Sequence, residues 1–209
     1  MPVTELACLR LKNGLPLSHA DNTALGIKLR AGVEEQAKYA NAKTSVLSQI
    51  EDPSYIYILG KWDSVAQHME EWVPSQRNQD IMAGLSEGLE LAWIRHVDLA
   101  SDSVEDERIP YSAPVVAIGR YAVAAENIGG FGSTFAGTKH HLKGFGGRRD
   151  ISGGWCADRD GQFILFSVWE AVEEHYSFAQ SEGFTEFGRI RNYLEEFEIK
   201  HARWEFTLD

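Results

Sequence analysis

The stretch YIYILGKWDSVAQH, residues 55–68, decides the fold class because its pattern recurs in the second half of the chain as FILFSVWEAVEEH, residues 163–175. In both stretches an apolar run ends in a tryptophan, and a histidine follows six residues later. Trp62 therefore aligns with Trp169 at an offset of 107. A repeat of roughly a hundred residues predicts a duplicated structural unit.

The residues around the first stretch predict one complete unit. The run before Trp62 is apolar on both faces, as in a strand that is buried on both sides. Alternating and helical periodicities on either side of it indicate the order β-α-β-β-α-β. The expected strands are 3–12, 45–50, 55–59 and 89–93, and the expected helices are 17–42, a short one after Asp63 as N-cap, and 76–85.

The second half predicts the same order of elements. Strands are expected at 115–121, 149–156 and 163–168, and a glycine-interrupted helix at 126–142. A second anchor, at an offset of 108, aligns Leu89, Leu91 and Arg95 with Phe197, Ile199 and Arg203. The acidic, polar segment between the halves is typical of a linker. We therefore expect domains at 1–100 and 114–209, joined by a linker at 101–113.

Composition narrows the classes of partner. The 209 residues are 44% hydrophobic, enough for a packed core, and carry a formal net charge of −11. This charge disfavours nucleic acid and anionic lipid. No apolar run approaches the roughly 20 residues of a membrane span, and the N-terminus lacks signal-peptide features, so we expect a cytoplasmic protein without a membrane partner. The spacing of Cys8 and Cys156 supports neither a disulfide framework nor a thiolate metal site.

The strand-Trp-helix-His signature, together with SEGFTEF at 181–187, resembles the antibiotic-biosynthesis-monooxygenase-like families of the dimeric α/β barrel superfamily. The resemblance covers nearly the whole chain, twice. It implies an α+β fold in which two ferredoxin-like units form an intramolecular dimeric α/β barrel, each with a pocket between sheet and helices. That superfamily includes cofactor-free monooxygenases, haem-degrading enzymes, cyclases, isomerases, lyases and stress proteins, so the fold alone does not fix the chemistry.

His68 and His175 are the candidate catalytic residues. Helical geometry directs His68 toward the sheet, and His175 has the same placement in the second half. A buried neutral imidazole can accept a proton near pH 7, which is the chemistry of a general base. The alternative is that both are core residues, each satisfied by a hydrogen bond to a backbone carbonyl.

The resemblance to the plant polyketide cyclases of the superfamily also points to these histidines. In that branch a histidine six residues after an aromatic starts an aldol closure. Here the aromatic is Trp62 or Trp169 rather than tyrosine, and neither first strand carries a histidine. These departures place a direct copy of the cyclase mechanism in doubt. The ligand histidine of the haem-degrading branch would fall at Trp72 and Ala179, which disfavours that activity.

Other residues are candidates for the wall of a substrate pocket. They are aromatic or imidazole side chains on the expected strands and helices: Trp62, Trp169, Tyr57, Tyr121, Tyr176 and His140. The adjacent His140 and His141 point about 100 degrees apart on a helix and cannot both bind one metal. Glycines around the helix at 126–142 indicate a flexible entrance rather than a dinucleotide fingerprint. We expect neither a metal nor a cofactor.

Three functions remain open. The first is a cofactor-independent enzyme of polyketide or related secondary-metabolite biosynthesis that cyclises, isomerises or eliminates from an enolisable hydrophobic substrate with a histidine base. The second is a cofactor-free monooxygenase of phenols or anthrones. The third is a non-enzymatic stress or ligand-binding barrel. We expect a monomer or weak homodimer, because the tandem satisfies the barrel internally.

Overall fold

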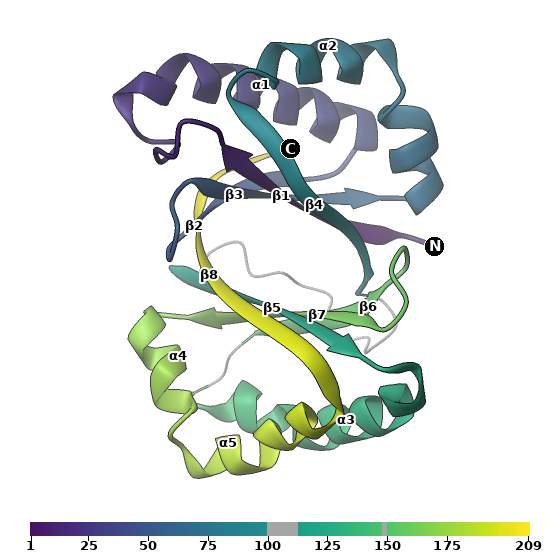
Figure 1. Cartoon of the computed structure of the whole chain (residues 1–209), viewed down its shortest axis with the longest axis vertical. Coiled ribbons are helices and arrows are strands. Elements are labelled where there is room, and N and C mark those ends of the chain that lie inside the picture. The colour runs from purple at the N-terminus through teal and green to yellow at the C-terminus, as the bar shows by residue number, and fades with distance from the viewer. Residues whose placement is uncertain (100–112, 148–149) are drawn as a thin grey trace. The chain divides into compact units, whose positions relative to one another are not determined.

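A computed structural model describes residues 1–99, 113–147 and 150–209 of the chain (Figure 1). The chain divides into two compact units, which we call unit 1 (Met1–Asp98 with Ala202–Asp209) and unit 2 (Leu99–His201). Of the expected linker at 101–113, only Ala113 lies within the described residues.

Unit 1 has the predicted β-α-β-β-α-β order. Its sheet runs β4-β1-β3-β2 and continues into the C-terminal part of β8, and all of these neighbours pair antiparallel. Both long helices lie on one face of this sheet (Figure 1). The elements are β1 (Val3–Leu11), η1 (Ala20–Asn22), α1 (Thr23–Ala40), β2 (Thr44–Gln49), β3 (Tyr55–Trp62), η2 (Gln67–Trp72), α2 (Gln76–Leu85) and β4 (Leu89–Asp98).

Unit 2 repeats the order with shorter helices after its central hairpin. Its sheet runs β6-β7-β5 and continues into the N-terminal part of β8. The elements are β5 (Val115–Val123), η3 (Ala125–Asn127), α3 (Ile128–Gly144), β6 (Ile151–Cys156), β7 (Gln162–Trp169), α4 (Val172–Phe178), α5 (Glu182–Phe187), η4 (Gly188–Tyr193) and β8 (Leu194–Leu208).

The strands follow the closed order β1-β3-β2-β8-β5-β7-β6-β4. The fold class is therefore α+β, with two ferredoxin-like units and an eight-stranded barrel order, which confirms the prediction from the repeat.

The helices and sheet of each unit enclose an apolar core. In unit 1, Leu29 and Val33 of α1 pack on Leu9 and Ile56 of the sheet. In unit 2 the corresponding layer is aromatic, and the Phe131 ring lies edge-on to Phe163 at 5.1 Å between centroids. Aromatic rings add edge-to-face attraction to the area they bury.

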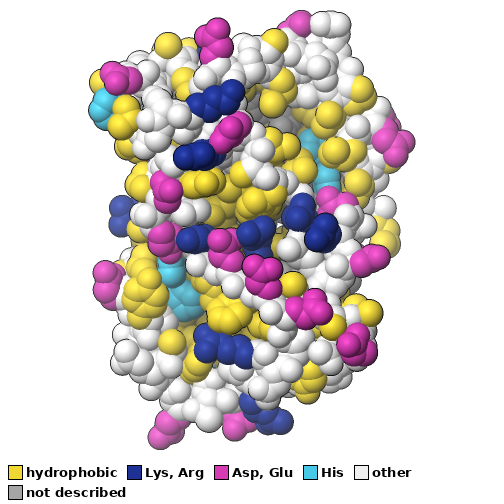
Figure 2. All heavy atoms as spheres, in the orientation of Figure 1, with side chains coloured by type: hydrophobic (Ala, Val, Ile, Leu, Met, Phe, Trp, Pro, Cys, Tyr) yellow, Lys and Arg dark blue, Asp and Glu magenta, His cyan; other side chains and the backbone are white. Residues whose placement is uncertain are grey.

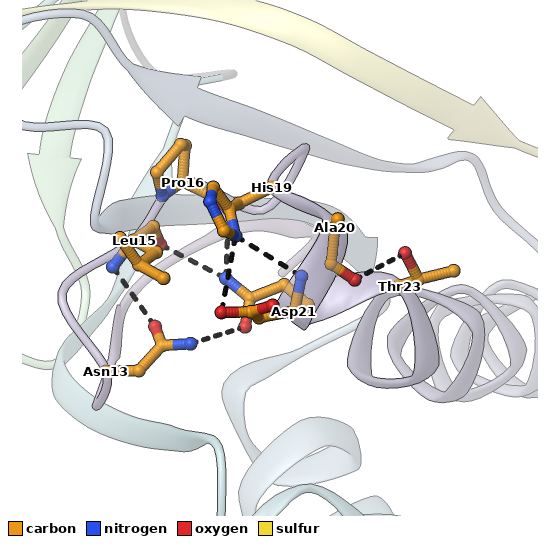
Figure 3. A network of polar contacts seen from close by, with 8 residues as sticks. Asn13, Leu15, Pro16, His19, Ala20, Asp21 and Thr23 are labelled. Carbon is orange, nitrogen blue, oxygen red and sulfur yellow. Dashed lines mark hydrogen bonds and ion pairs between the residues drawn. The ribbon is translucent and has the colours of Figure 1, made fainter.

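The first long helix begins later than the sequence predicts. The expected start is residue 17, but α1 begins at Thr23. The preceding loop, between Asn13 and Asp21, forms a compact turn (Figure 3), and the buried Asn22 holds it together. Its Nδ2 donates to the Pro16 carbonyl at 2.9 Å, and its Oδ1 accepts from Asn13 Nδ2 at 2.8 Å. Asparagine side chains compete in this way with helical hydrogen bonds.

The register between the first and third strands of each unit, β1 with β3 and β5 with β7, positions the tryptophan of the repeat. On the paired strand, Val3 lies opposite Trp62 in unit 1 and Val115 lies opposite Trp169 in unit 2. The two units can thus be compared position by position along these strands.

The amino-acid composition predicts a charged surface and no membrane-spanning segment. Acidic and basic side chains are interspersed over the face shown in Figure 2. Among the described helices, none is both long and apolar enough to span a bilayer.

Candidate active site

His68 lies in η2, a single turn of π-helix in which the Val73 amide donates to the His68 carbonyl at 2.9 Å. Such wide turns are rare and often occur at functional sites. The imidazole is buried and stacks on Trp62, with ring centroids 4.2 Å apart and planes 7° from parallel.

A second histidine completes a pair in unit 1. His68 Nδ1 lies 2.8 Å from Nε2 of His96, which is fully buried on β4. Only one of the two nitrogens that share this bond carries the hydrogen, so the bond fixes the tautomer of one imidazole relative to the other.

A buried carboxylic acid lies on the other side of His68. Glu5 Oε2 is 3.8 Å from His68 Nε2 and accepts hydrogen bonds from Trp62 Nε1 at 2.8 Å and Gln36 Nε2 at 2.6 Å. Burial raises the pKa of Glu5 from 4.5 to about 7, opposed by the Trp62 hydrogen bond, the His96 charge and the Gln36 hydrogen bond. Unit 1 therefore holds a carboxyl–imidazole–imidazole chain in its core.

Gly60 makes room for this acid. It lies opposite Glu5 in the β1–β3 register. A Cβ at this position would approach Gln36 Nε2 to 2.9 Å and Glu5 Oε2 to 3.1 Å. A side chain here would therefore collide with the acid and its amide partner.

Unit 2 reproduces the tryptophan and the two histidines. His175 on α4 stacks on Trp169 at 4.4 Å and 15°, and its Nδ1 lies 2.8 Å from His201 Nε2. The two imidazole rings of each pair are 5.0 Å apart, at 70° in unit 1 and 73° in unit 2. The aromatic framework is thus the same in the two units.

The acid is missing from unit 2. Its register places Ala117 where unit 1 has Glu5, and Ser167 where unit 1 has Gly60. The Trp169 Nε1 donates to Ser167 Oγ at 3.0 Å, so the serine replaces the carboxylate as acceptor for the tryptophan.

A cavity of about 30 Å³ borders His175 in unit 2. This volume accommodates roughly two water-sized groups. The wall combines small residues of β5 and β7 with aromatic side chains of the helices, and includes Ala117, Gly119, Tyr121, Ser167, His175, Phe178, Phe184, Phe187, Arg191 and Phe197.

Three polar side chains besides His175 border this cavity: those of Ser167, Tyr121 and Arg191. Burial raises the pKa of Tyr121 to about 12, and the nearby charge of Arg191 opposes that shift. The Arg191 guanidinium lies over the Phe184 ring at 4.9 Å and the Phe197 ring at 5.1 Å. Cation–π contacts of this kind hold an arginine without consuming its hydrogen-bond donors.

The other predicted wall residues lie elsewhere. Tyr57 is buried in unit 1 and accepts from Gln49 Nε2 at 2.7 Å. Tyr176 is 56% exposed, with its ring 5.8 Å from that of His201. The rings of His140 and His141 lie 4.0 Å apart, tilted by 36°, and line a surface groove between α3 and the α5–η4 segment rather than the cavity beside His175.

Sequence reasoning missed Glu5, His96 and His201. His96 and His201 are 105 residues apart, whereas the assumed offset of 108 pairs His96 with Trp204. The last strands therefore correspond in a register three residues from the predicted one. An alignment anchored on histidines instead of apolar residues could have found the pair.

In the described parts of the chain, no group of three or more His, Cys, Asp or Glu side chains is arranged to hold a metal ion. The polar groups beside the cavity are instead suited to proton transfer and to hydrogen bonding with an organic ligand.

Comparison with known proteins identifies relatives by structure alone. No protein-family model matches the sequence, and no curated protein matches it either. A putative monooxygenase from Fusobacterium nucleatum superposes with a TM-score of 0.71 at 12% identity, covering 100% of this chain and 94% of that one.

Two further structures show the same similarity. A chlorite dismutase variant from Candidatus Nitrospira defluvii has a TM-score of 0.66 at 10% identity, over 98% of this chain and 92% of that one. An anthrone oxidase-like protein has 0.65 at 13% identity, over 98% and 92%. With the strand order and the internal repeat, these similarities show that the chain has the dimeric α/β barrel fold in a tandem, single-chain form.

Proposed function

We propose that the chain is a cofactor-independent enzyme that removes a proton from an enolisable, hydrophobic small molecule, with His175 as the general base. The observation that carries the proposal is the cavity beside His175, at the place where unit 1 holds the Glu5 carboxyl group. An aromatic wall with one imidazole suits an apolar substrate with one acidic C–H bond.

His201 would orient the base. If His175 Nδ1 donates to His201 Nε2 across their 2.8 Å contact, the lone pair of His175 lies on its own Nε2. The equivalent nitrogen of His68 is the one that faces Glu5 in unit 1. By this correspondence His175 Nε2 faces the cavity and would take the substrate proton, producing an enolate.

We assign catalysis to His175 rather than to His68. His68 and its partners Glu5 and His96 are each at most 3% exposed, so a substrate would have to displace packed core. His175 is half-buried. For unit 1 we propose a structural role, which is the non-enzymatic alternative confined to one half of the chain.

The enolate could then react in two ways. Isomerisation needs only return of the proton to another atom of the enolate. Elimination releases a leaving group from the carbon beta to the carbonyl, and cyclisation forms a carbon–carbon bond to an electrophilic carbonyl whose oxygen takes up the proton. A cofactor-free monooxygenase reaction is the second candidate, favoured by the names of the structural relatives described as a monooxygenase and as anthrone oxidase-like. In that reaction an anthrone and dioxygen would give an anthraquinone and water, with the substrate supplying the electrons.

Haem chemistry does not fit the residues present. The positions ten residues after the tryptophans, where the resemblance places the haem-ligand histidine, hold Trp72 and Ala179.

The test uses two probes, β-tetralone under nitrogen in deuterium oxide and anthrone under air. Proton exchange is followed by NMR and dioxygen consumption by an oxygen electrode. We expect the wild-type protein to accelerate exchange and His175→Ala to lose at least 100-fold of that acceleration, because a positioned base contributes roughly 10²–10⁴. The matched control is His140→Ala, which removes an exposed imidazole from the same unit.

The two probes separate the candidates. Exchange without oxygen uptake supports the cyclase, isomerase or lyase, and uptake that requires His175 supports the monooxygenase. Equal rates for wild type and His175→Ala, or no acceleration of either probe by the wild type, contradict a catalytic base in unit 2.

A further inference from the structure

We infer that the unit 2 cavity is an oxyanion site, which takes the acidic oxygen of a small carboxylic acid, phenol or enol in the place where unit 1 holds the Glu5 carboxyl group. The inference deepens the proposed function and rests on it for the location of the site. It adds the chemical class of the ligand.

The duplicated framework is the first support. In unit 1 the Glu5 carboxyl group occupies the space beside Trp62 and His68. In unit 2 the Trp169–His175 stack and the His175–His201 bond are kept, but Ala117 replaces the acid and a cavity borders the alanine. Unit 1 therefore shows, with a side chain of its own, which group this framework can accept.

The hydrogen bond of Trp169 shows that unit 2 is adapted to the missing acid. A buried indole donor without an acceptor costs stability. Ser167 accepts the hydrogen bond of Trp169 Nε1 at 3.0 Å, so this bond does not depend on a ligand in the cavity. His175 also lies on the cavity wall.

Two further donors on the wall favour an anion. Tyr121 is 5% exposed, and among the described residues its hydroxyl has no hydrogen-bond partner. The ring reaches back over Gly119, where a Cβ would lie 2.6 Å from the hydroxyl oxygen. Glycine at this position thus allows the tyrosine to place its O–H at the cavity.

Arg191 supplies the positive charge. It lies between two aromatic rings on the cavity wall and forms no ion pair within the described part of the chain. The residues that line the cavity include no aspartate or glutamate. In a chain of net charge −11, a cavity with an arginine and no acid is a local exception that favours an anionic oxygen.

The experiment compares benzoate with benzamide, which has nearly the same shape without the charge, by isothermal titration calorimetry. Only the carboxylate or amide group has to enter the cavity of about 30 Å³, and the ring would lie at the rim beside Phe197, which is 46% exposed. We expect the wild-type protein to bind benzoate at least tenfold more tightly. Arg191→Gln should bring the two affinities to within about twofold, and Tyr121→Phe should weaken benzoate binding several-fold. Ala117→Glu should abolish benzoate binding, because it supplies the acid that unit 1 contains.

Arg191 is exposed, so Arg191→Gln keeps the test interpretable even if Ala117→Glu fails to fold. Equal wild-type affinities for the two probes, or a preference for benzoate that survives Arg191→Gln, would overturn the inference. Benzoate preference without proton exchange supports the oxyanion site and contradicts the base. Proton exchange without a preference for benzoate supports the catalytic base and contradicts the oxyanion site.

Discussion

Glu5 is a carboxylic acid in the core of unit 1, with 3% of its surface exposed. Burial favours its neutral form, and three neighbouring groups only partly compensate. Replacing one partner of such a buried cluster commonly costs more than the cluster contributes, because the remaining groups lose their hydrogen bonds.

The raised pKa of Glu5 predicts that stability falls as pH rises. The folded chain binds this proton up to a pH of about 7, whereas the unfolded chain releases it near 4.5. Between these values the folded state binds more protons, so the free energy of unfolding decreases with pH and reaches its lower level above 7. The difference is about 3 kcal/mol.

Urea unfolding at pH 5 and pH 8 measures this effect. Glu5→Gln should remove most of the decrease, since an amide does not titrate. The control, Glu34→Gln, changes an exposed acid whose pKa is lowered by Lys38, and should leave the decrease in place. The assignment fails if wild type and Glu5→Gln respond identically to pH.

At this scale the sequence predicts the histidines but not their partners. The repeat of Trp62 and His68 is visible because both residue types are uncommon and equally spaced in the two halves. Glu5 is a lone acid in a strand, a pattern typical of an exposed residue, and nothing local indicates that Gly60 leaves space for it. That information lies in the pairing of strands distant in sequence.

Among the elements, α3 contains five glycines and α1 contains two. Glycines weaken a helix because they lose more backbone entropy on folding. The sequence predicts this weakness and, correctly, the location of the helix. It cannot show which glycines are required by packing, because that depends on contacts with other elements.

Two substitutions in α3 distinguish a glycine that packing requires from one that packing does not require. A Cβ at Gly132 would have no neighbour within 4 Å, so Gly132→Ala should stabilise unit 2 by about 1 kcal/mol. A Cβ at Gly130 would approach Tyr193 Cε1 to 2.4 Å, so Gly130→Ala should destabilise it. Thermal unfolding should give shifts of opposite sign, and shifts of the same sign would contradict the packing of η4 on α3.

The sequence predicts the position of a helix better than its type. The helix predicted around residues 76–85 is α2, which has Ser75 as its N-cap. The residues after Trp62 were expected to form an ordinary short helix with Asp63 as N-cap. They form a π-turn instead, and Ser64 Oγ accepts the Gln67 amide at 3.0 Å. Side-chain spacing fits both helix types, so only the backbone hydrogen bonds distinguish them.

For the whole molecule, the duplicated pattern and the apolar strands predict two β-α-β-β-α-β units, and the resemblance to the dimeric α/β barrel superfamily implies the barrel that they form. Function is less accessible at this scale, since solved structures of the same fold at 10–13% identity carry several different names. The chemistry depends on a few side chains that differ between the two units.

We predict that the chain is a monomer or a weak dimer in solution. Sedimentation velocity at low micromolar concentration should give a mass near 23.4 kDa for the predominant species. Dilution should remove any larger species. A large assembly that persists on dilution would contradict the prediction.

The exchange of Glu5 and Gly60 for Ala117 and Ser167 has an evolutionary consequence. From a Glu–Gly ancestor, gaining the serine first would crowd the acid, and losing the acid first would leave the indole donor of the tryptophan without its acceptor. Each single step carries a penalty that the second step relieves. The Glu–Gly and Ala–Ser forms of the unit are therefore separated by less stable single-substitution intermediates. This barrier would preserve the filled site of unit 1 and the cavity of unit 2 long after the rest of the two sequences had diverged.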